Sequence, residues 1–557
     1  MLTSDKEVVQ LIVDQCKLHN VKTLVFSPGS RNSPLAIAFD EDKFFRTFVI
    51  HDERSAAFFA LGIAQEKKEL VAICCTSGSA LLNYYPAVAE AFYRNIPLLV
   101  ISADRPSAWI DQGDGQTIRQ QKVFELHSHG FLQLEDAVLD TEKLWYYQRE
   151  TSILFNKLKR GPFHLNVALR EPLYSTVVKS KEYGRKISFF TSNNKISTID
   201  IEAIKENLKS KKIMVICGQM HENPLLLSKL IDFSINTGAV VLAEHTSNLH
   251  DERFISCIDR TLNGIDSKTA YEPEVLVHVG DAIVSKRIKS FLREIPNLEV
   301  IRISNETNPQ DTFQHLSLHI SIEPVDFFDQ FKNYETTNTS NFYGKWKQID
   351  VQAKDKIESI TSSLKGLNDW YSFYLIHQYL KENTVVHLGN SSVVRYAQLF
   401  DMVKGCQYYA NRGTSGIDGS FSTAVGSAVA SPDKHHLFIS GDISFIYDHN
   451  ALWIENFPSN LRVIILNNSG GGIFRIIEGS KDSEKNSRYF EASHQQLAAP
   501  IISGFSKSVQ QLTNVSNLDI HLSTFLTFEE TSCQFLEIIT ESDSNSPILS
   551  NFFKLLK

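Results

Sequence analysis

Short apolar runs alternate with amphipathic, helix-like stretches along almost the whole of this 557-residue chain. Alternation of this kind is typical of α/β units, in which helices cover the faces of a mostly parallel sheet. We therefore expect an α/β fold with mostly parallel sheets. The runs that predict strands are residues 22–27, 47–51, 70–76, 96–102, 162–169, 212–218, 239–245, 274–280, 298–304, 384–390, 435–442, 461–468 and 534–540.

Two polar stretches, at residues 179–197 and 333–342, interrupt this alternation. A chain of this length is too long for a single hydrophobic core, because domains contain roughly 150 residues on average. We predict three consecutive α/β domains, at residues 1–180, 181–345 and 346–557.

Composition narrows the class of protein. Hydrophobic residues make up 42% and charged residues 22% of the chain, which is ordinary for globular domains. The net charge of −8 argues against nucleic acid or an anionic membrane as a partner, and no apolar run approaches the ~18 residues of a membrane span. The start of the chain does not look like a signal peptide, and the seven scattered cysteines fit buried thiols. We expect a cytoplasmic protein that binds neither nucleic acid nor membrane.

The most specific motif lies in the last third of the chain. One predicted strand ends at Gly441-Asp442 and the next ends at Asn468, with a helical segment expected near 450–456. This spacing fits a strand–helix–strand crossover, which brings the carboxyl ends of two parallel strands to one edge of the sheet. A carboxylate, an amide oxygen and the backbone near Gly470 are hard oxygen ligands that suit Mg²⁺. The motif therefore predicts a divalent metal site.

A second feature is the stretch "VIHDERSAAFFALG" at residues 49–62, in which a predicted strand ends and a predicted helix begins at Glu53. Ligands of open α/β sheets bind at the carboxyl edge of the strands. The residues alone leave two alternatives open. Glu53 is either a first-turn acid that favours the positive end of a helix, or a functional carboxylate at a ligand site.

Together these features resemble the thiamine-diphosphate-dependent enzymes, in which a divalent metal anchors the cofactor diphosphate. The resemblance implies thiamine diphosphate with Mg²⁺ or Mn²⁺, and Asp442, Asn468 and Gly470 as metal ligands. It also implies that Glu53 hydrogen-bonds the aminopyrimidine ring and favours the imino tautomer, whose nitrogen removes the proton from C2. An apolar setting that raises the pKa of Glu53 would help. The residues implied to contact the cofactor are Glu53, Ser391, Ile417, Gly441, Asp442, Ser444, Asn468, Ile473 and Phe474.

Four further stretches point to one family among these enzymes: "SPGSRNSPL" (27–35), "ADRPSAWIDQGDGQTIRQ" (103–120), "GNSSVVR" (389–395) and "NRGTSGIDGSFSTAVG" (411–426). They are similar to the 2-succinyl-5-enolpyruvyl-6-hydroxy-3-cyclohexene-1-carboxylate synthases of menaquinone biosynthesis. The resemblance implies a transferase that decarboxylates 2-oxoglutarate and adds the succinic semialdehyde carbanion to isochorismate, without releasing pyruvate. It covers all three predicted domains, most densely at both ends.

Both of these substrates carry two carboxylates, and the planar fork of arginine is the preferred clamp for a carboxylate. Each arginine taken singly would also fit a surface ion pair. The resemblance implies catalytic roles for Glu53, Gln116, Arg31 and Ser30, and it implies that Ile417 props the cofactor into a bent shape. Gly115 stands beside Gln116 where the family pattern has a larger polar residue, so we expect one substrate hydrogen bond to be missing. The residues implied to contact substrate are Ser30, Arg31, Arg105, Gln116, Lys286, Arg287, Ser391, Arg395 and Arg412.

The resemblance also implies a homodimer or homotetramer, with the first domain of one chain facing the third domain of another at each active site. The middle domain contains "CGQMHENP" rather than the spaced glycines of a dinucleotide fingerprint, so we expect a spacer that binds no nucleotide. The polar segment 478–496 follows the predicted metal loop, and we predict that it is a mobile lid.

Two other functions fit parts of the sequence. A thiamine-diphosphate decarboxylase or carboligase acting on pyruvate, such as an acetolactate synthase, would share the metal motif but would not need so many arginines. A catalytically inactive, ligand-binding relative would share the fold. The presence of Glu53, Asp442 and Asn468 argues against an inactive relative.

Overall fold

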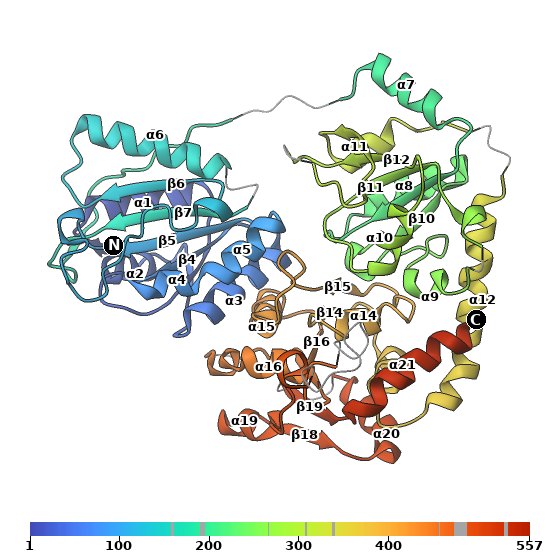
Figure 1. The fold of residues 1–557 in the computed structure, drawn as a ribbon. Helices are drawn as coiled ribbons and strands as arrows, with labels where there is room; N and C mark the ends of the chain where they lie inside the picture. The colour runs from blue at the N-terminus through green and yellow to red at the C-terminus, as the bar shows by residue number, and fades with distance from the viewer. Residues whose placement is uncertain are drawn as a thin grey trace.

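The computed structural model describes residues 1–157, 161–189, 195–265, 267–306, 309–336, 340–455, 457–472, 487–528 and 533–557. Three parallel sheets follow one another along the chain, and Figure 1 shows the first and middle sheets above the last one. A short antiparallel pair joins β1 (Leu2–Ser4) to β8 (Thr176–Val178). The predicted α/β fold with mostly parallel sheets is confirmed.

The first sheet has the strand order β3-β2-β4-β5-β7-β6, and all of its pairs are parallel. Its inner strands are buried along their length because helices cover both faces, which explains their continuous apolar sequences. The strands are β2 (Thr23–Phe26), β3 (Arg46–Val49), β4 (Val71–Cys75), β5 (Leu98–Asp104), β6 (Phe131–Glu135) and β7 (Phe163–Ala168). The helices are α1 (Glu7–Leu18), α2 (Ser33–Asp40), α3 (Glu53–Lys67), α4 (Ser79–Asn83), α5 (Tyr85–Tyr93) and α6 (Thr141–Lys157).

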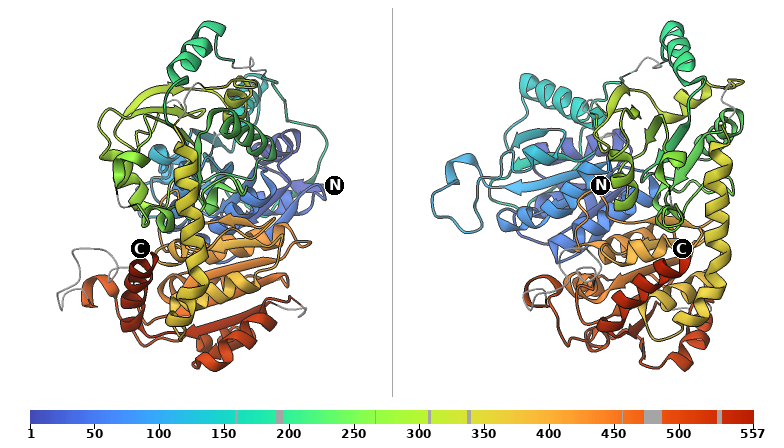
Figure 2. Two further views of the ribbon diagram at one scale, coloured as in Figure 1. Left: turned by 90° about the vertical axis from the view of Figure 1, so that its right-hand side faces the viewer. Right: turned by 45° about the vertical axis from the view of Figure 1, so that its right-hand side comes forward.

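The middle sheet has the order β10-β9-β11-β12-β13, again with every pair parallel. Its strands are β9 (Ile213–Cys217), β10 (Val240–Ala243), β11 (Val275–Val279), β12 (Glu299–Ile303) and β13 (Leu316–Ile320). Its helices are α7 (Thr198–Leu208), α8 (Pro224–Thr237), α9 (Ile258–Leu262), α10 (Lys286–Arg293) and α11 (Pro324–Asp329). The long helix α12 (Phe342–Leu364) then runs from the middle sheet down the side of the last one, as both views of Figure 2 show.

The last sheet has the order β15-β14-β16-β17-β19-β18 and is also parallel throughout. Its strands are β14 (Val385–Leu388), β15 (Gln407–Tyr409), β16 (His436–Gly441), β17 (Leu461–Asn467), β18 (Val509–Leu512) and β19 (Gln534–Ile539). Its helices are α13 (Asp369–Tyr379), α14 (Val393–Ala397), α15 (Ser420–Ala430), α16 (Asp442–Tyr447), α19 (Ala498–Gly504), α20 (Val515–Phe525) and α21 (Ser542–Leu556).

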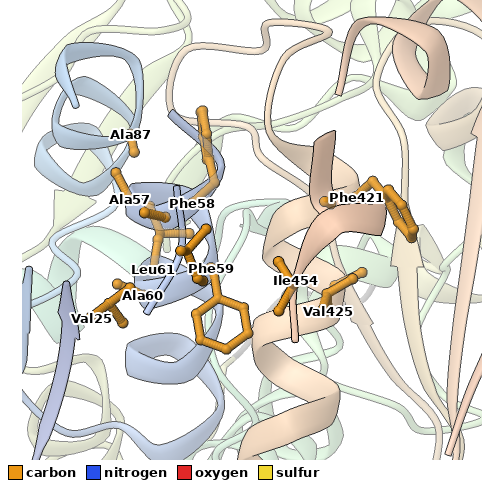
Figure 3. Packing of buried hydrophobic residues seen from close by; sticks show 14 of the residues in the cluster. Val25, Ala57, Phe58, Phe59, Ala60, Leu61, Ala87, Phe421, Val425 and Ile454 are labelled. Atoms are coloured by element: carbon orange, nitrogen blue, oxygen red, sulfur yellow. The ribbon is translucent and has the colours of Figure 1, made fainter. Parts of the chain in front are cut away.

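Helices α3 and α15 join the first and last sheets within one chain. A Cβ atom on Gly62 would lie 2.1 Å from the carbonyl oxygen of Thr423, and one on Gly426 would lie 2.0 Å from that of Phe59. Only glycine allows the two helix backbones to approach this closely. Around the crossing, Figure 3 shows side chains of both helices in one hydrophobic cluster. The middle of α3 is therefore packed closely against the last third of the chain.

Each apolar run that predicted a strand overlaps one in the structure. The helical segment expected near 450–456 is confirmed in part: a 3₁₀ helix spans His449–Trp453, and α16 precedes it, beginning at Asp442 directly after the strand. All seven cysteines are buried and free, as predicted. Across the described ranges, no helix is both long enough and apolar enough to cross a membrane. The three domain boundaries stay predictions.

Candidate active site

The two halves of the predicted metal motif lie next to each other. Strands β16 and β17 are neighbours, with Gly441 paired to Leu466, so Asp442 and Asn468 follow adjacent strand ends at the same edge of the sheet. This confirms the placement predicted from the crossover spacing. Both side chains are buried, at 2% and 5% exposure.

The carboxylate of Asp442 is held by backbone groups. The N–H of Ile443 donates to its Oδ1 at 2.7 Å and the N–H of Gly470 donates to its Oδ2 at 3.0 Å. Burial raises the pKa of Asp442 to about 6, and the nearby carboxylate of Asp369 also raises it. His494 lies 3.4 Å from Oδ2. Two buried carboxylates in one place favour a bound cation.

The side-chain amide of Asn468 has a definite orientation. Its Nδ2 donates to Oδ2 of Asp369 at 3.0 Å, while its Oδ1 is buried without a hydrogen-bond partner in the described part of the chain. A buried acceptor left unsatisfied costs about 1–3 kcal/mol, so such an atom is suited to bind a ligand. The described residues contain no cluster of three His, Cys, Asp or Glu side chains that could hold a metal. Asp442, Asn468 Oδ1 and a backbone carbonyl fit a cation that shares phosphate oxygens.

The loop that contains Ile417 links the other predicted cofactor contacts. The Ser444 hydroxyl donates to the carbonyl of Ile417 at 2.7 Å, which ties the Ile417 loop to the start of α16. The amide of Asn390 donates to the carbonyl of Gly416 at 2.6 Å, and Ser391 beside it has a positive φ of 75°. Asn390 was not predicted from the sequence. Ile473 and Phe474 lie outside the described residues.

Glu53 is the first residue of α3, at the carboxyl edge of the first sheet. Burial raises the pKa of Glu53, and the charge of Asp52 raises it further, which is the direction that the proposed proton exchange needs. Burial raises the pKa of Cys75 and of Tyr84, and the charge of Glu53 raises both further. The carboxylate of Glu53 therefore lies within electrostatic range of these two buried groups.

Arg31 and Arg105 come together at the same edge. Arg31 donates to the carbonyl of Leu169 at 3.1 Å and pairs with Glu171 at 3.0 Å, while Arg105 pairs with Asp114 at 2.8 Å. Burial lowers the pKa of Arg31, and the charge of Arg105 lowers it further. Ser30 directly precedes Arg31 in the turn after β2.

A buried polar network supports the loops around Gln116. Asn166 on β7 donates to Asp104 at 2.7 Å and accepts from Gln120 at 2.9 Å, and Gln120 accepts from the N–H of Gly78 at 2.8 Å. A Cβ on Gly78 would lie 3.1 Å from the Gln116 backbone. Sequence reasoning missed both: Asn166 is a single polar residue inside an apolar strand, and Gln120 lies in an irregular loop, so neither forms a motif.

A second cationic group lies between the middle and last sheets. Arg412 donates to Oδ1 of Asn390 at 2.9 Å. Burial lowers the pKa of both Arg395 and Arg412, and the charge of Arg395 lowers that of Arg412 further. In the described ranges the Nε atoms of both arginines are buried without a hydrogen-bond partner. Buried donors without acceptors indicate an anionic ligand.

Lys289 on α10 belongs to this second group, although the sequence did not indicate it. Burial lowers the pKa of Lys289, and the charges of Arg412 and Arg395 lower it further, against an opposing effect of Glu244. Glu244 is buried and accepts from the N–H groups of Val284 and Ser285 at 2.6 Å each; burial raises its pKa to about 7.

The two middle-domain residues predicted from the resemblance lie elsewhere on α10. Lys286 and Arg287 are exposed at the start of this helix, and the guanidinium of Arg287 lies 3.9 Å from the ring centre of Phe553 on α21. On α10 it is Lys289 that lies within electrostatic range of the two arginines. Substrate contacts of Lys286 and Arg287 stay predictions.

The predicted lid is only partly described, because residues 473–486 fall outside the described ranges. Residues Ser487–Glu491 form a π-helical turn. The carbonyl of Glu491 accepts from Gly471 at 2.6 Å, and the N–H of His494 donates to the carbonyl of Ser469 at 3.1 Å. The end of this segment therefore packs on the metal loop; its mobility stays a prediction.

Comparison with known proteins gives two matches to protein families. Residues 6–124 match the N-terminal TPP binding domain of thiamine pyrophosphate enzymes, and residues 388–519 match their C-terminal TPP binding domain. These matches contain the strand ends that carry Glu53 and Asp442.

Similar proteins cover nearly the whole chain. Proteins of Flavobacterium psychrophilum and Flavobacterium johnsoniae are both 41% identical, over 99% of this chain and 98% and 99% of their own lengths. A protein of Porphyromonas gingivalis is 33% identical over 99% of this chain and 97% of its own. All three are named 2-succinyl-5-enolpyruvyl-6-hydroxy-3-cyclohexene-1-carboxylate synthase.

Proposed function

The chain belongs to the 2-succinyl-5-enolpyruvyl-6-hydroxy-3-cyclohexene-1-carboxylate synthase family of thiamine-diphosphate-dependent enzymes, and on this premise we propose its substrates and cofactors. It decarboxylates 2-oxoglutarate and joins the remaining four-carbon unit to isochorismate in menaquinone biosynthesis, without releasing pyruvate. Asp442, Asn468 and Gly470 would hold Mg²⁺ or Mn²⁺, which would anchor the cofactor diphosphate.

The observation that carries the substrate class is the group formed by Arg395, Arg412 and Lys289. These are three cations, each partly withdrawn from water, and the Nε donors of both arginines are buried without a partner in the described part of the chain. Keeping such charges together favours an anion that pairs with more than one of them. Pyruvate has one carboxylate, whereas 2-oxoglutarate and isochorismate each have two. The group therefore supports dicarboxylate substrates over pyruvate.

The residues at the ends of β16 and β17 fit the cofactor. Asp442, the free Oδ1 of Asn468 and the backbone at Gly470 would hold the metal, and Ser444 and Ile417 would lie beside the cofactor. Thiamine diphosphate, when bound, supplies the carbon nucleophile and the electron sink for decarboxylation. Glu53 exchanges a proton between its carboxyl oxygen and the aminopyrimidine ring, and its raised pKa keeps part of the carboxyl population protonated.

From the resemblance to the family, we propose an active site shared between two chains. Arg31 and Arg105 contact residues of the first sheet and its loops, whereas Arg395, Arg412 and Lys289 contact residues of the middle and last sheets. A homodimer or homotetramer in which the first group of one chain faces the second group of another would complete two equivalent sites.

The direct test is CO₂ release. We expect release from 2-oxoglutarate only when thiamine diphosphate and Mg²⁺ or Mn²⁺ are both present, and a product that contains both carbon skeletons when isochorismate is added. Faster release from pyruvate would favour an acetolactate synthase activity. Cofactor binding without CO₂ release from any 2-oxo acid would indicate an inactive relative.

Replacing Arg412 or Arg395 with Ala should raise KM far more for 2-oxoglutarate than for pyruvate. A hydrogen bond to a charged group contributes roughly 1.5–3 kcal/mol, which corresponds to about a ten- to hundred-fold change. The measurement is steady-state KM for both acids. Arg293→Ala is the matched control, because Arg293 is exposed on α10 and donates to the carbonyl of Thr312. Equal losses on both acids would argue for a folding defect instead.

A further inference from the structure

Asp369 is a buried acid that none of the sequence motifs contains. It is the first residue of α13, 2% exposed, and follows Asn368, whose side chain accepts from the N–H of Tyr371. Its Oδ2 accepts from Nδ2 of Asn468 at 3.0 Å and its Oδ1 accepts from the hydroxyl of Thr540 at 2.7 Å. Both carboxylate oxygens therefore point at donors within the last sheet.

The hydrogen bond to Asn468 decides which end of that amide is free. An amide has one donor end and one acceptor end, and the two have nearly the same shape. If the amide of Asn468 flipped, its Oδ1 would face the carboxylate of Asp369, so two acceptors would oppose each other. With Asp369 in place, Oδ1 is the free end, buried and without a hydrogen-bond partner in the described part of the chain.

Asp369 is itself held from two other elements. Its own N–H donates to Oδ1 of Asn545 on α21 at 2.9 Å, and Thr540 follows β19, where its N–H donates to the carbonyl of Asn467 at 2.9 Å. The carboxylate thus has little freedom to turn away. Outer groups of this kind orient metal ligands and affect metal affinity strongly.

We propose that Asp369 is a positioning residue for the divalent metal: it holds the amide of Asn468 so that Oδ1, and not Nδ2, faces the cation. This inference rests on the metal site in the proposed function and adds the residue that selects the orientation of its amide ligand.

The test is Mn²⁺ affinity in the presence of saturating thiamine diphosphate, measured by electron paramagnetic resonance rather than by activity. Asp369→Leu should weaken Mn²⁺ binding about ten- to hundred-fold, which is the usual effect of removing an outer partner of a metal ligand. Asp369→Ser removes the same carboxylate acceptor with a small polar side chain, and it decides the question if the Leu variant does not fold.

Asp369→Asn is the matched control. Its amide oxygen can still accept from Asn468 while its NH₂ donates to the hydroxyl of Thr540, so Mn²⁺ affinity should stay within a few-fold of the parent value. A loss as large as in Asp369→Leu would show that charge, and not orientation, matters, and would overturn the proposal.

A second control separates this inference from the proposed function. Asp442→Ala removes the charged ligand itself and should abolish tight Mn²⁺ binding. If Asp442→Ala binds Mn²⁺ as the parent does, the proposed metal site is wrong. If Asp442→Ala loses Mn²⁺ while folded Asp369→Leu or Asp369→Ser keeps the parent affinity, the metal site stands and the role of Asp369 is overturned.

Discussion

Glu53→Gln is expected to slow exchange of the C2 proton of bound thiamine diphosphate by a factor on the order of 10²–10⁴, the usual contribution of a positioned acid–base group. Glutamine keeps the size and one acceptor oxygen but cannot hold the proton that the carboxyl exchanges with the aminopyrimidine ring. The measurement is the rate at which deuterium replaces the C2 proton, followed by NMR after acid quenching. Affinity for the cofactor should change little.

The same variant, with a matched control, tests the alternative that Glu53 only stabilises the start of α3. If its carboxylate only favoured the positive end of α3, Glu53→Gln would cost about 0.3–1 kcal/mol of stability and leave C2 exchange unchanged. Asp52→Asn is the control: it removes the neighbouring charge, yet asparagine still accepts the hydrogen bond from Ser55 that caps the helix. We expect exchange to persist in Asp52→Asn. Exchange at the parent rate in Glu53→Gln would refute the proton-transfer role.

Two inactive variants, Glu53→Gln and Asp442→Ala, are expected to restore activity when they share a dimer. If each site takes Glu53 from one chain and Asp442 from another, one site of a mixed dimer carries both defects and the other carries neither. With random exchange, half of the dimers are mixed and half of their sites are intact. Activity should therefore return to about a quarter of the parent level. Activity is measured after co-expression of differently tagged chains.

In the structure, the elements that carry Glu53 and Asp442 also contact each other within one chain. Arg54 donates to the carbonyl of Tyr447 at 2.6 Å, and the amide of Asn450 donates to Asp52 at 2.5 Å, so the start of α3 contacts the end of α16 in the same chain. If Glu53 and Asp442 of one chain formed a site together, every site in the mixture would carry a defect. Purified mixed dimers that remain inactive would rule out the shared site.

The sequence predicted the inner strands but missed several edge strands, and burial explains the difference. Inner strands such as β9 and β11 are buried along their whole length, so their sequences are continuous apolar runs. The edge strands β13 and β18 are partly exposed and contain polar residues, so no run marks them. The sequence also missed the start of α16: the apolar pattern after Asp442 does not show that this helix begins directly at the strand end, ahead of the expected helical segment.

Sequence alone determined the parallel α/β fold and the strand ends that carry Glu53, Asp442 and Asn468, because strand burial and strand–helix junctions leave a local pattern. Only the tertiary structure decided which side chains complete the site. Asp369 lies 99 residues from Asn468, and Lys289 meets Arg395 and Arg412 across two sheets. Such contacts depend on side-chain direction and on packing between elements far apart in the chain, and neither leaves a local pattern in the sequence.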